Sequence, residues 1–306
     1  MLGPFLETLI GGLMTGVLYA LVALGFVLIF KASGVFNFAQ GAMVLFAALS
    51  FARLSEFMPL VLAFALSVLI MIALAYAIEF LVLRRLVNQE GIILFMATLG
   101  IAYFLEGFGQ SLWGSDIYKI GLGLPTNPIF ILESIFPGGL LIEPTELIAA
   151  TICAVMVLAL AVFFQVTRVG RALRAVADDH QAAQSVGIPL NRIWLMVWAV
   201  SGLVALVAGM MWGAKLGVQF SLSLIALKAL PVLILGGFTS IPGAIVGGLI
   251  IGAGEKLAEV FLAPILIRTF DLAGGGIENW FAYVLALVFL LIRPQGLFGE
   301  RIIERV

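Results

Sequence analysis

Long hydrophobic runs, separated by short polar segments, make up most of the chain. A helix needs about 20 mostly apolar residues to cross the hydrocarbon core of a bilayer. Runs near that length lie at Thr8–Phe30, Pro59–Leu83, Ile92–Leu112, Thr145–Val166, Ile193–Gly213 and Asn279–Ile292. Shorter runs lie at Phe38–Phe51, Leu222–Gly237 and Ile241–Leu262, and the first two of these are short enough to be re-entrant or broken helices. The pattern predicts nine spans, to within one or two, in a single membrane domain over residues 1–306.

Composition places the chain in the all-α, polytopic membrane class. Of its residues 63% are hydrophobic and 11% charged, whereas soluble proteins have about 45–50% apolar and about 25% charged residues. The long first run has no positively charged region before it, which predicts a retained helix rather than a cleaved signal. A net charge of −1 gives no support to nucleic-acid binding.

The chain has few of the residue types that commonly act in catalysis or bind metals. With one cysteine, Cys153, and one histidine, His180, it can form neither a disulfide framework nor a Cys/His metal cluster. We expect Cys153, inside an apolar run, to be a small core residue. A membrane-embedded enzyme is disfavoured because no catalytic constellation is evident.

Basic residues predict the orientation. With nine spans, one set of loops holds ten basic residues and the other four, and basic residues are retained on the cytoplasmic side. The N-terminus is therefore predicted outside and the C-terminus in the cytoplasm. The first set is Lys31, Arg84, Arg85, Arg168, Arg171, Arg174, Arg192, Arg293, Arg301 and Arg305; the second is Arg53, Lys119, Lys215 and Arg268.

Two loops stand out. The outer loop, residues 114–144, has turn residues at Pro137-Gly138-Gly139 between Phe130–Phe136 and Leu140–Glu143, which predicts a hairpin. This hairpin is either part of a docking surface for an extracytoplasmic partner or a lid between helices. The inner loop, residues 168–192, predicts a short amphipathic helix.

The predicted inner helix extends from Arg171 to Val186. Gly170 is expected to end the preceding helix, and Gly187 to terminate the inner helix itself. Its apolar stripe comprises Ala172, Val176, Ala183 and Val186. Small residues on this face suit insertion into a groove of another protein. Binding to the lipid surface is the alternative, weakened by Asp178 and Asp179.

Two helix starts are candidates for the transport pathway. Asn37 and Gln40 are spaced as a capping box, directly before Gly41. Ser240 is expected to cap the next candidate, with Pro242 in the first turn. Ordinary capping at the membrane interface is the simpler interpretation. If the helices start below the surface, their free N–H groups could meet a substrate carboxylate.

Ionisable residues within predicted spans include Lys228, Glu255 and Glu106. Lys228 and Glu255 lie roughly 12 Å and roughly 10 Å from the outer ends of neighbouring antiparallel spans, at 1.5 Å per residue. We expect them to pair, or to share a polar cluster with Glu106, because a lone charge at this depth costs at least about 2.5–3.5 kcal/mol. Outward extension of each side chain is the alternative.

Glycines recur at four-residue intervals within the spans, which favours close helix packing. The pairs are Gly12/Gly16, Gly209/Gly213, Gly243/Gly247 and Gly248/Gly252.

Over nearly its whole length the chain resembles permease subunits of ATP-binding-cassette importers for branched-chain amino acids, a family that also serves urea and short amides. The resemblance depends on four segments in order: GLMTGVLYALVALGFVLIFKASGVFNFAQGAM, VTRVGRALRAVADDHQAAQSVGI, LKALPVLILGGFTSIPGAIVGGLIIGAGE and RPQGLFGE.

The inner loop is also similar to the EAA loop through which such permeases engage their ATPases. Gln181-Ala182-Ala183 followed by Gly187 matches Glu-Ala-Ala-x-x-x-Gly with glutamine for glutamate, whereas the downstream Ile-x-Leu-Pro part is not evident. The resemblance implies polar contacts from Arg171 and Arg174. It also implies close approach at Ala182, Ala183 and Gly187.

The resemblance implies an alternating-access importer in the cytoplasmic membrane of a bacterium or archaeon. Its partners would be a second permease, two ATPase subunits and an extracytoplasmic binding protein. ATP and Mg²⁺ would bind to the ATPases, and this chain has no GxxxxGK[ST] phosphate loop. Urea or amide transport, and a self-contained secondary carrier or channel, are the alternatives.

Overall fold

The computed structural model describes residues 2–86, 89–125, 127–133, 136, 139–178, 180–270 and 276–299, with the backbone alone at 178, 180 and 181. The chain divides into two compact units. Unit 1 comprises Met1–Ala23, Gly123–Met156 and Lys228–Val306, and unit 2 comprises Leu24–Leu122 and Val157–Leu227. The single-domain organisation expected from the sequence stays a prediction.

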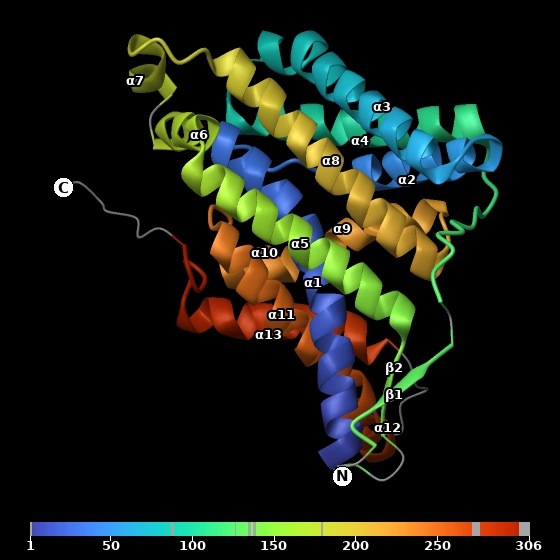
Figure 1. Cartoon of the computed structure of the whole chain (residues 1–306). Coiled ribbons are helices and arrows are strands. Elements are labelled where there is room, and N and C mark those ends of the chain that lie inside the picture. Colours follow the sequence, from blue (N-terminus) through green and yellow to red (C-terminus); the bar gives the residue numbers. More distant parts are fainter. Residues whose placement is uncertain are drawn as a thin grey trace. The chain divides into compact units, whose positions relative to one another are not determined.

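Helices dominate both units (Figure 1). In chain order the elements are α1 (Leu2–Ser33), α2 (Gln40–Phe57), α3 (Leu60–Leu81), η1 (Leu83–Arg85), α4 (Gly91–Trp113), β1 (Ile129–Ile131), β2 (Leu140–Ile142), α5 (Pro144–Val166), α6 (Arg168–Asp178), α7 (His180–Ser185), α8 (Leu190–Leu216), η2 (Phe220–Leu224), α9 (Ile225–Lys228), α10 (Leu230–Gly236), α11 (Ile241–Leu257), η3 (Ala258–Leu262), α12 (Ala263–Phe270) and α13 (Ile277–Ile292).

Five helices in the described part of the chain are long and apolar enough to cross a membrane. These are Leu2–Ser33, Leu60–Arg85, Gly91–Trp113, Pro144–Val166 and Leu190–Leu216. The segments Phe220–Gly236 and Ile241–Phe270 form a pair bent by 114°, which raises the count to six if the pair is one span. The all-α, multi-pass fold class is confirmed, with fewer full-length candidate spans than the nine apolar runs.

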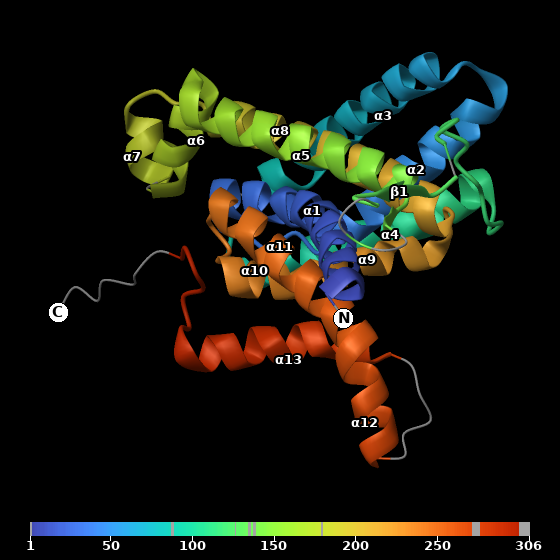
Figure 2. The same cartoon turned by 60° about the horizontal axis from the view of Figure 1, so that its bottom comes forward.

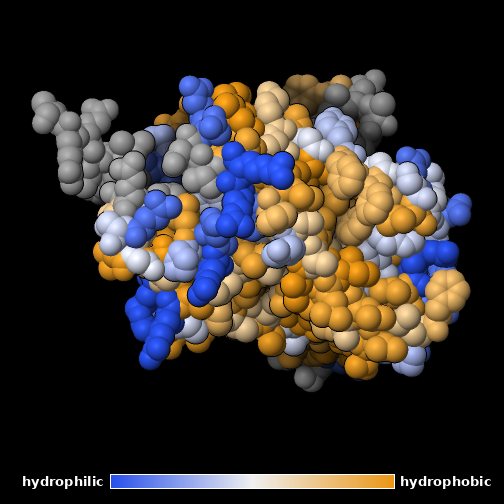
Figure 3. All heavy atoms as spheres, turned by 90° about the horizontal axis from the view of Figure 1, so that it is seen from above, coloured by the Kyte–Doolittle hydropathy of each residue, from blue (hydrophilic) through white to orange (hydrophobic). Residues whose placement is uncertain are grey.

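Hydrophobic side chains lie on the outside of the spans as well as inside. Val61 on α3 is 83% exposed and Tyr103 on α4 is 71% exposed. Figure 3 shows hydrophobic residues over much of one face, beside a narrower strip of hydrophilic residues. Apolar surface of this extent suits contact with lipid or with other subunits.

Unit 2 is built around α8, which packs against α2 and α3 (Figure 1). Residues 40–52 of α2 are all buried. Gly209 lets α8 approach α2 closely, since a Cβ there would lie 2.6 Å from the carbonyl oxygen of Val44. Small residues thus allow the helix contact that the glycine spacing predicted.

Unit 1 contains the first part of α1, α11, α10 and α13, together with the β hairpin. The helices α10, α11 and α13 pack on one another, and α12 projects steeply away from α13 (Figure 2). Past α13, the N–H groups of Leu297 and Phe298 donate to the carbonyl oxygens of Leu235 and Gly236. These bonds satisfy the last turn of α10, whose carbonyls have no partner within their own helix.

The run Leu222–Gly237, predicted as one short span, is divided into η2, α9 and α10. Lys228 ends α9, Ala229 separates the helices, and Pro231 lies in the first turn of α10. Because proline has no N–H to donate, a continuous helix cannot pass through this position without losing a hydrogen bond.

The outer hairpin is confirmed in its pairing. Strands β1 and β2 are antiparallel, with Phe130 opposite Leu141. The first strand is shorter than predicted and ends at Ile131, where the next residue, Leu132, has a φ of 56°. Whether the hairpin docks a partner or acts as a lid stays a prediction.

Candidate functional site

A buried polar network occupies the break between α1 and α2, within unit 2. Asn37 and Gln40 are both fully buried. The Asn37 amide nitrogen donates to Oε1 of Gln40 over 3.3 Å, and the hydroxyl of Ser201 on α8 donates to the same oxygen over 2.8 Å. Ser201 also lies 3.2 Å from the carbonyl oxygen of Gly25. The network therefore joins α1, α2 and α8 at one point.

The Gln40 amide nitrogen differs from the rest of this network. Among the described residues, Nε2 of Gln40 is buried without a hydrogen-bond partner. It lies beside Gly25, where an added Cβ would be 2.2 Å away. An unsatisfied buried amide costs about 1–3 kcal/mol. Gly25 provides the space for the Gln40 amide, and Nε2 of that amide can still donate a hydrogen bond.

Aromatic rings hold the same break. Phe36 stacks on Phe26 with ring centroids 4.8 Å apart, and Phe38 packs edge-on against both Phe36 and Phe95. The break therefore lies in a packed aromatic setting rather than in a loose loop.

The expected capping box at Asn37 and Gln40 is wrong. The helix begins at Gln40, with Ala39 at the N-cap position and no side-chain cap. The Asn37 side chain instead accepts a hydrogen bond from the N–H of Ala39 over 3.1 Å. This local turn competes with helix, so the helix starts later and the Gln40 side chain is directed to Ser201.

The next two pathway candidates are Gly41, at a tight helix junction, and Ser240, at a helix cap. A Cβ on Gly41 would lie 2.2 Å from the carbonyl oxygen of Ser223, so α2 packs directly on η2. The cap at Ser240 is confirmed, because its hydroxyl accepts from the N–H of Gly243 over 3.0 Å. A role in the pathway stays a prediction for all four residues.

The structure brings Lys228 and Glu255 together within unit 1. Nζ of Lys228 lies 3.0 Å from Oε1 of Glu255. The phenol of Tyr19 donates to the same oxygen over 3.2 Å. The Glu255 side chain is 9% exposed and that of Lys228 is 38% exposed. A carboxylate buried at this depth is thus compensated by one cation and one hydroxyl.

Glu106 lies on α4 in unit 2. Its participation in a polar cluster with Lys228 and Glu255 stays a prediction. The sequence did not indicate Tyr19, which lies in the middle of an apolar run. The sequence feature that points to a polar contact there is the phenol hydroxyl, because a buried tyrosine O–H usually needs a hydrogen-bond partner.

The inner loop forms two helices, α6 and α7, instead of one, and Asp179 between them lies outside the described residues. Gly170 does not end the preceding helix. The chain leaves α5 at Val166, and Thr167 caps α6 by accepting from the N–H of Gly170 over 3.2 Å. A Cβ on Gly170 would overlap the backbone of Phe164, so this glycine serves close packing.

The two candidate arginines contact the end of α5. The Arg174 guanidinium donates to the carbonyl oxygens of Phe164 (2.6 Å) and Gln165 (3.4 Å). Arg171 donates to that of Val166 over 3.2 Å. Cations near a helix C-terminus are favoured by the helix dipole. The arginines therefore fix the angle at which α6 leaves α5.

Helix α7 ends in a Schellman motif, which agrees with the prediction that Gly187 terminates the inner helix. Gly187 has a φ of 88°, its N–H donates to the Gln184 carbonyl, and the N–H of Ile188 donates to the Ala183 carbonyl. Ala183 is buried, whereas Ala182 and Gly187 are exposed. The side chain of Gln181 lies outside the described residues.

The predicted apolar stripe of the inner loop is only partly buried. Val176 and Ala183 are buried, and Ala172 is half-buried. Val186 is 81% exposed, and insertion of the stripe into a groove of another protein stays a prediction.

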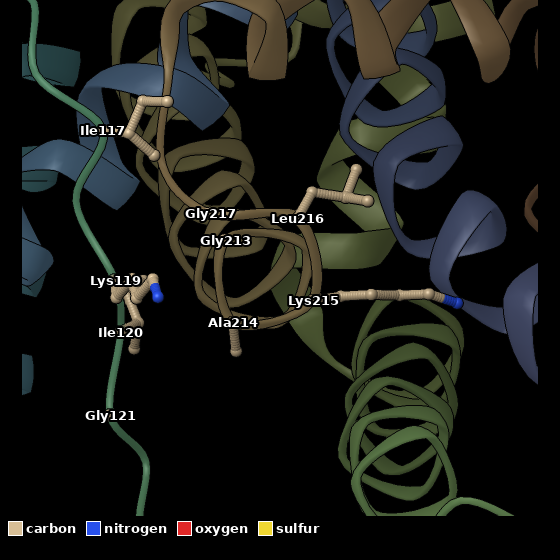
Figure 4. Close-up of a pocket in the computed structure, with 9 residues that line it drawn as sticks. All are labelled: Ile117, Lys119, Ile120, Gly121, Gly213, Ala214, Lys215, Leu216 and Gly217. Carbon is tan, nitrogen blue, oxygen red and sulfur yellow. The ribbon is translucent and has the colours of Figure 1, made fainter.

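A cavity of about 430 Å³ opens between residues 117–121 and the end of α8 in unit 2 (Figure 4). Tyr118 and Val218 form a short antiparallel bridge beside it. Its two lysines do not converge, since Lys215 extends away from Lys119 and lies over the ring of Trp212. The cavity therefore lacks the convergent polar groups that mark a ligand site.

Comparison with known proteins gives full-length matches. The chain is 30% identical to the high-affinity branched-chain amino acid transport system permease protein BraD of Pseudomonas aeruginosa, covering 99% of this chain and 98% of that one. It is 28% identical to LivH of Escherichia coli, over 99% and 98% of the two chains. It is also 28% identical to a probable LivH permease of Methanocaldococcus jannaschii, over 94% and 91%.

The fold has a counterpart among solved structures. PsaBC from Streptococcus pneumoniae, determined in complex with Fab, matches with a TM-score of 0.51 at 16% identity, over 96% of this chain and 97% of that one. Residues 8–293 match the family described as branched-chain amino acid transport system / permease component. The chain is therefore a membrane permease that belongs to this branched-chain amino acid transport family.

Proposed function

We propose that the chain is the transmembrane permease subunit of an ATP-binding-cassette importer, and that it forms the pathway for branched-chain amino acids by alternating access. The observation that carries the proposal is the full-length similarity to BraD and LivH, whose names state this transport. In this role the chain is not an enzyme, and partner subunits hydrolyse ATP. It resides in the cytoplasmic membrane with its N-terminus outside.

The complex contains a second permease, two ATPase subunits that bind ATP and Mg²⁺, and an extracytoplasmic binding protein. The α6–α7 segment is the contact for the ATPases. Two features support this role: Ala182 and Gly187 are exposed, and Arg171 and Arg174 attach the segment to the end of α5. Movement of α6 is therefore transmitted to a membrane-spanning helix.

The pathway lies beside the break between α1 and α2, within unit 2. Gln40 supports this placement, since its buried Nε2 has no partner among the described residues and its Oε1 joins two helices. A conformational change that separates α8 from α2 exposes both atoms to substrate. Differential contacts of this kind are required for a ligand to shift a transporter between states.

Affinity purification of the tagged chain from its native membrane, followed by reconstitution in proteoliposomes, tests the proposal. We expect ATPase and binding-protein subunits to copurify, and uptake of leucine, isoleucine and valine to require ATP hydrolysis. Uptake of urea without uptake of leucine would show that the substrates are urea and short amides instead of branched-chain amino acids. Uptake driven by an ion gradient with a hydrolysis-deficient ATPase would contradict the importer.

Topology is tested separately with a single cysteine. Ala182→Cys in a Cys153→Ser background is expected to react with a membrane-impermeant maleimide only after the cell is opened. Reaction in intact cells would place α7 outside and would contradict its role as the ATPase contact.

A further inference from the structure

The ion pair of Lys228 and Glu255 is built from three separate segments of unit 1. Lys228 is the last residue of α9, Glu255 lies on α11 and Tyr19 on α1. Both donors contact Oε1 of Glu255. The pair therefore presents one positive and one negative group next to each other.

The cluster retains capacity to bind more. An ammonium group has three donors and a carboxylate about four acceptor sites, and the described contacts use one donor of Lys228 and one oxygen of Glu255. The Lys228 side chain is 38% exposed. Thr15, one turn before Tyr19 on the same face of α1, is 7% exposed, and its hydroxyl has no hydrogen-bond partner among the described residues.

Lys228 also lies at a helix break. The chain passes from α9 to α10 through Ala229, and Pro231 prevents a continuous helix. Irregular backbone at membrane depth is tolerated where it is buried in protein or lines a cavity. Broken helices are where membrane transporters commonly bind substrates and ions.

We propose that this pair is a binding site for a zwitterionic α-amino acid, with the substrate carboxylate on Lys228 and the substrate ammonium on Glu255. The inference rests on the proposed transport function and assigns its substrate class to specific residues. When the zwitterion enters, one internal ion pair is exchanged for two pairs with the ligand, so every charge stays compensated.

The same exchange discriminates against neutral compounds. Urea and short amides carry no charge, and opening the pair for them would leave a lysine and a glutamate uncompensated at membrane depth. The structure thus favours an amino acid over urea by chemistry in the permease itself, independently of the binding protein.

Uptake of radiolabelled leucine by the reconstituted complex tests the proposal. We expect Lys228→Met and Glu255→Gln each to lower uptake at least about tenfold, because each leaves one charged partner unpaired. The matched control is the neighbouring ion pair Lys256–Glu259. Its Nζ and Oε2 atoms lie 2.7 Å apart, and both side chains are exposed. Lys256→Met and Glu259→Gln should leave uptake within about twofold, as expected for surface pairs.

The charge-reversed double variant, Lys228→Glu with Glu255→Lys, separates binding from folding. It keeps an ion pair, so the amount of protein in the membrane should return to the wild-type level. Leucine uptake should stay at least about tenfold low, because the two charges now face the wrong ends of the substrate. Recovery of uptake together with protein level would show that the pair is structural and would overturn the proposal.

The outcome also separates this inference from the proposed function. If the wild-type complex takes up leucine and the Lys228 and Glu255 variants match the control variants, the inference fails and the transport function stands. If the wild-type complex takes up urea and no amino acid, both fail.

Discussion

Gly16 of α1 and Gly248 of α11 bring two helix backbones so close that a Cβ on Gly16 would lie 2.5 Å from the Gly248 carbonyl oxygen. One turn further along, a Cβ on Gly252 would lie 2.4 Å from Cα of Gly16. Van der Waals packing through small residues replaces the hydrophobic effect as the driving force between helices in lipid. This contact holds Tyr19 beside Glu255, since each residue lies within one turn of these glycines.

Gly16→Ala is therefore expected to destabilise unit 1. The added methyl group cannot be accommodated without separating the helices, which costs about 1–3 kcal/mol. The thermal midpoint of the purified protein in detergent measures the effect. Gly11→Ala is the matched control on the same helix, because no described residue lies within 4 Å of a Cβ there. Equal midpoints for the two variants would contradict the close contact.

Ser201→Ala is expected to weaken the junction of α1, α2 and α8. The change removes a donor from Gln40 and costs about 0.5–1.5 kcal/mol. Ser67→Ala is a matched control, since among the described residues the buried Ser67 hydroxyl bonds only to the Ala63 carbonyl within its own helix. A thermal midpoint lowered as much by the control as by Ser201→Ala would show that the hydroxyl does not link the helices.

Gly187→Trp is expected to abolish ATPase association without preventing membrane insertion. Among the described residues nothing lies within 4 Å of a Cβ on Gly187, so the added tryptophan is expected to project outward, where it would clash with a partner. Gly187→Ala controls for the backbone strain at a φ of 88°, which costs about 1–2 kcal/mol. Copurification of ATPase measures the result. Retention of ATPase by the tryptophan variant would exclude a close contact at Gly187.

Ser240→Ala is expected to destabilise the start of α11 by about 0.5–2 kcal/mol through loss of the cap on Gly243. Ser240→Thr preserves a capping hydroxyl and should keep most of the stability. The thermal midpoints of the two variants provide the measurement. A threonine variant as unstable as the alanine variant would mean that the cap is not the source of the effect.

Features that depend on neighbouring residues were predictable from the sequence. The lengths of the apolar runs predicted the all-α membrane fold, the turn residues at 137–139 predicted the hairpin, and Ser240 and Gly187 marked helix ends. The pairing of Lys228 with Glu255 followed from matched depths on neighbouring spans. Each of these depends on chain geometry over a few residues or on a single turn between two helices.

Contacts between distant segments were decided only by the tertiary structure. Tyr19 meets Glu255 across 236 positions of sequence, and Ser201 meets Gln40 across 161. One local feature was mispredicted as well: the Asn37 side chain accepts from the N–H of Ala39, two residues on, and α2 starts at Gln40 without a cap from Asn37. The physical reason is that burial of apolar area is non-directional, so an apolar sequence pattern does not specify which residues will be in contact. A hydrogen bond requires donor and acceptor within about 3 Å in a defined direction, which only the packed helices provide.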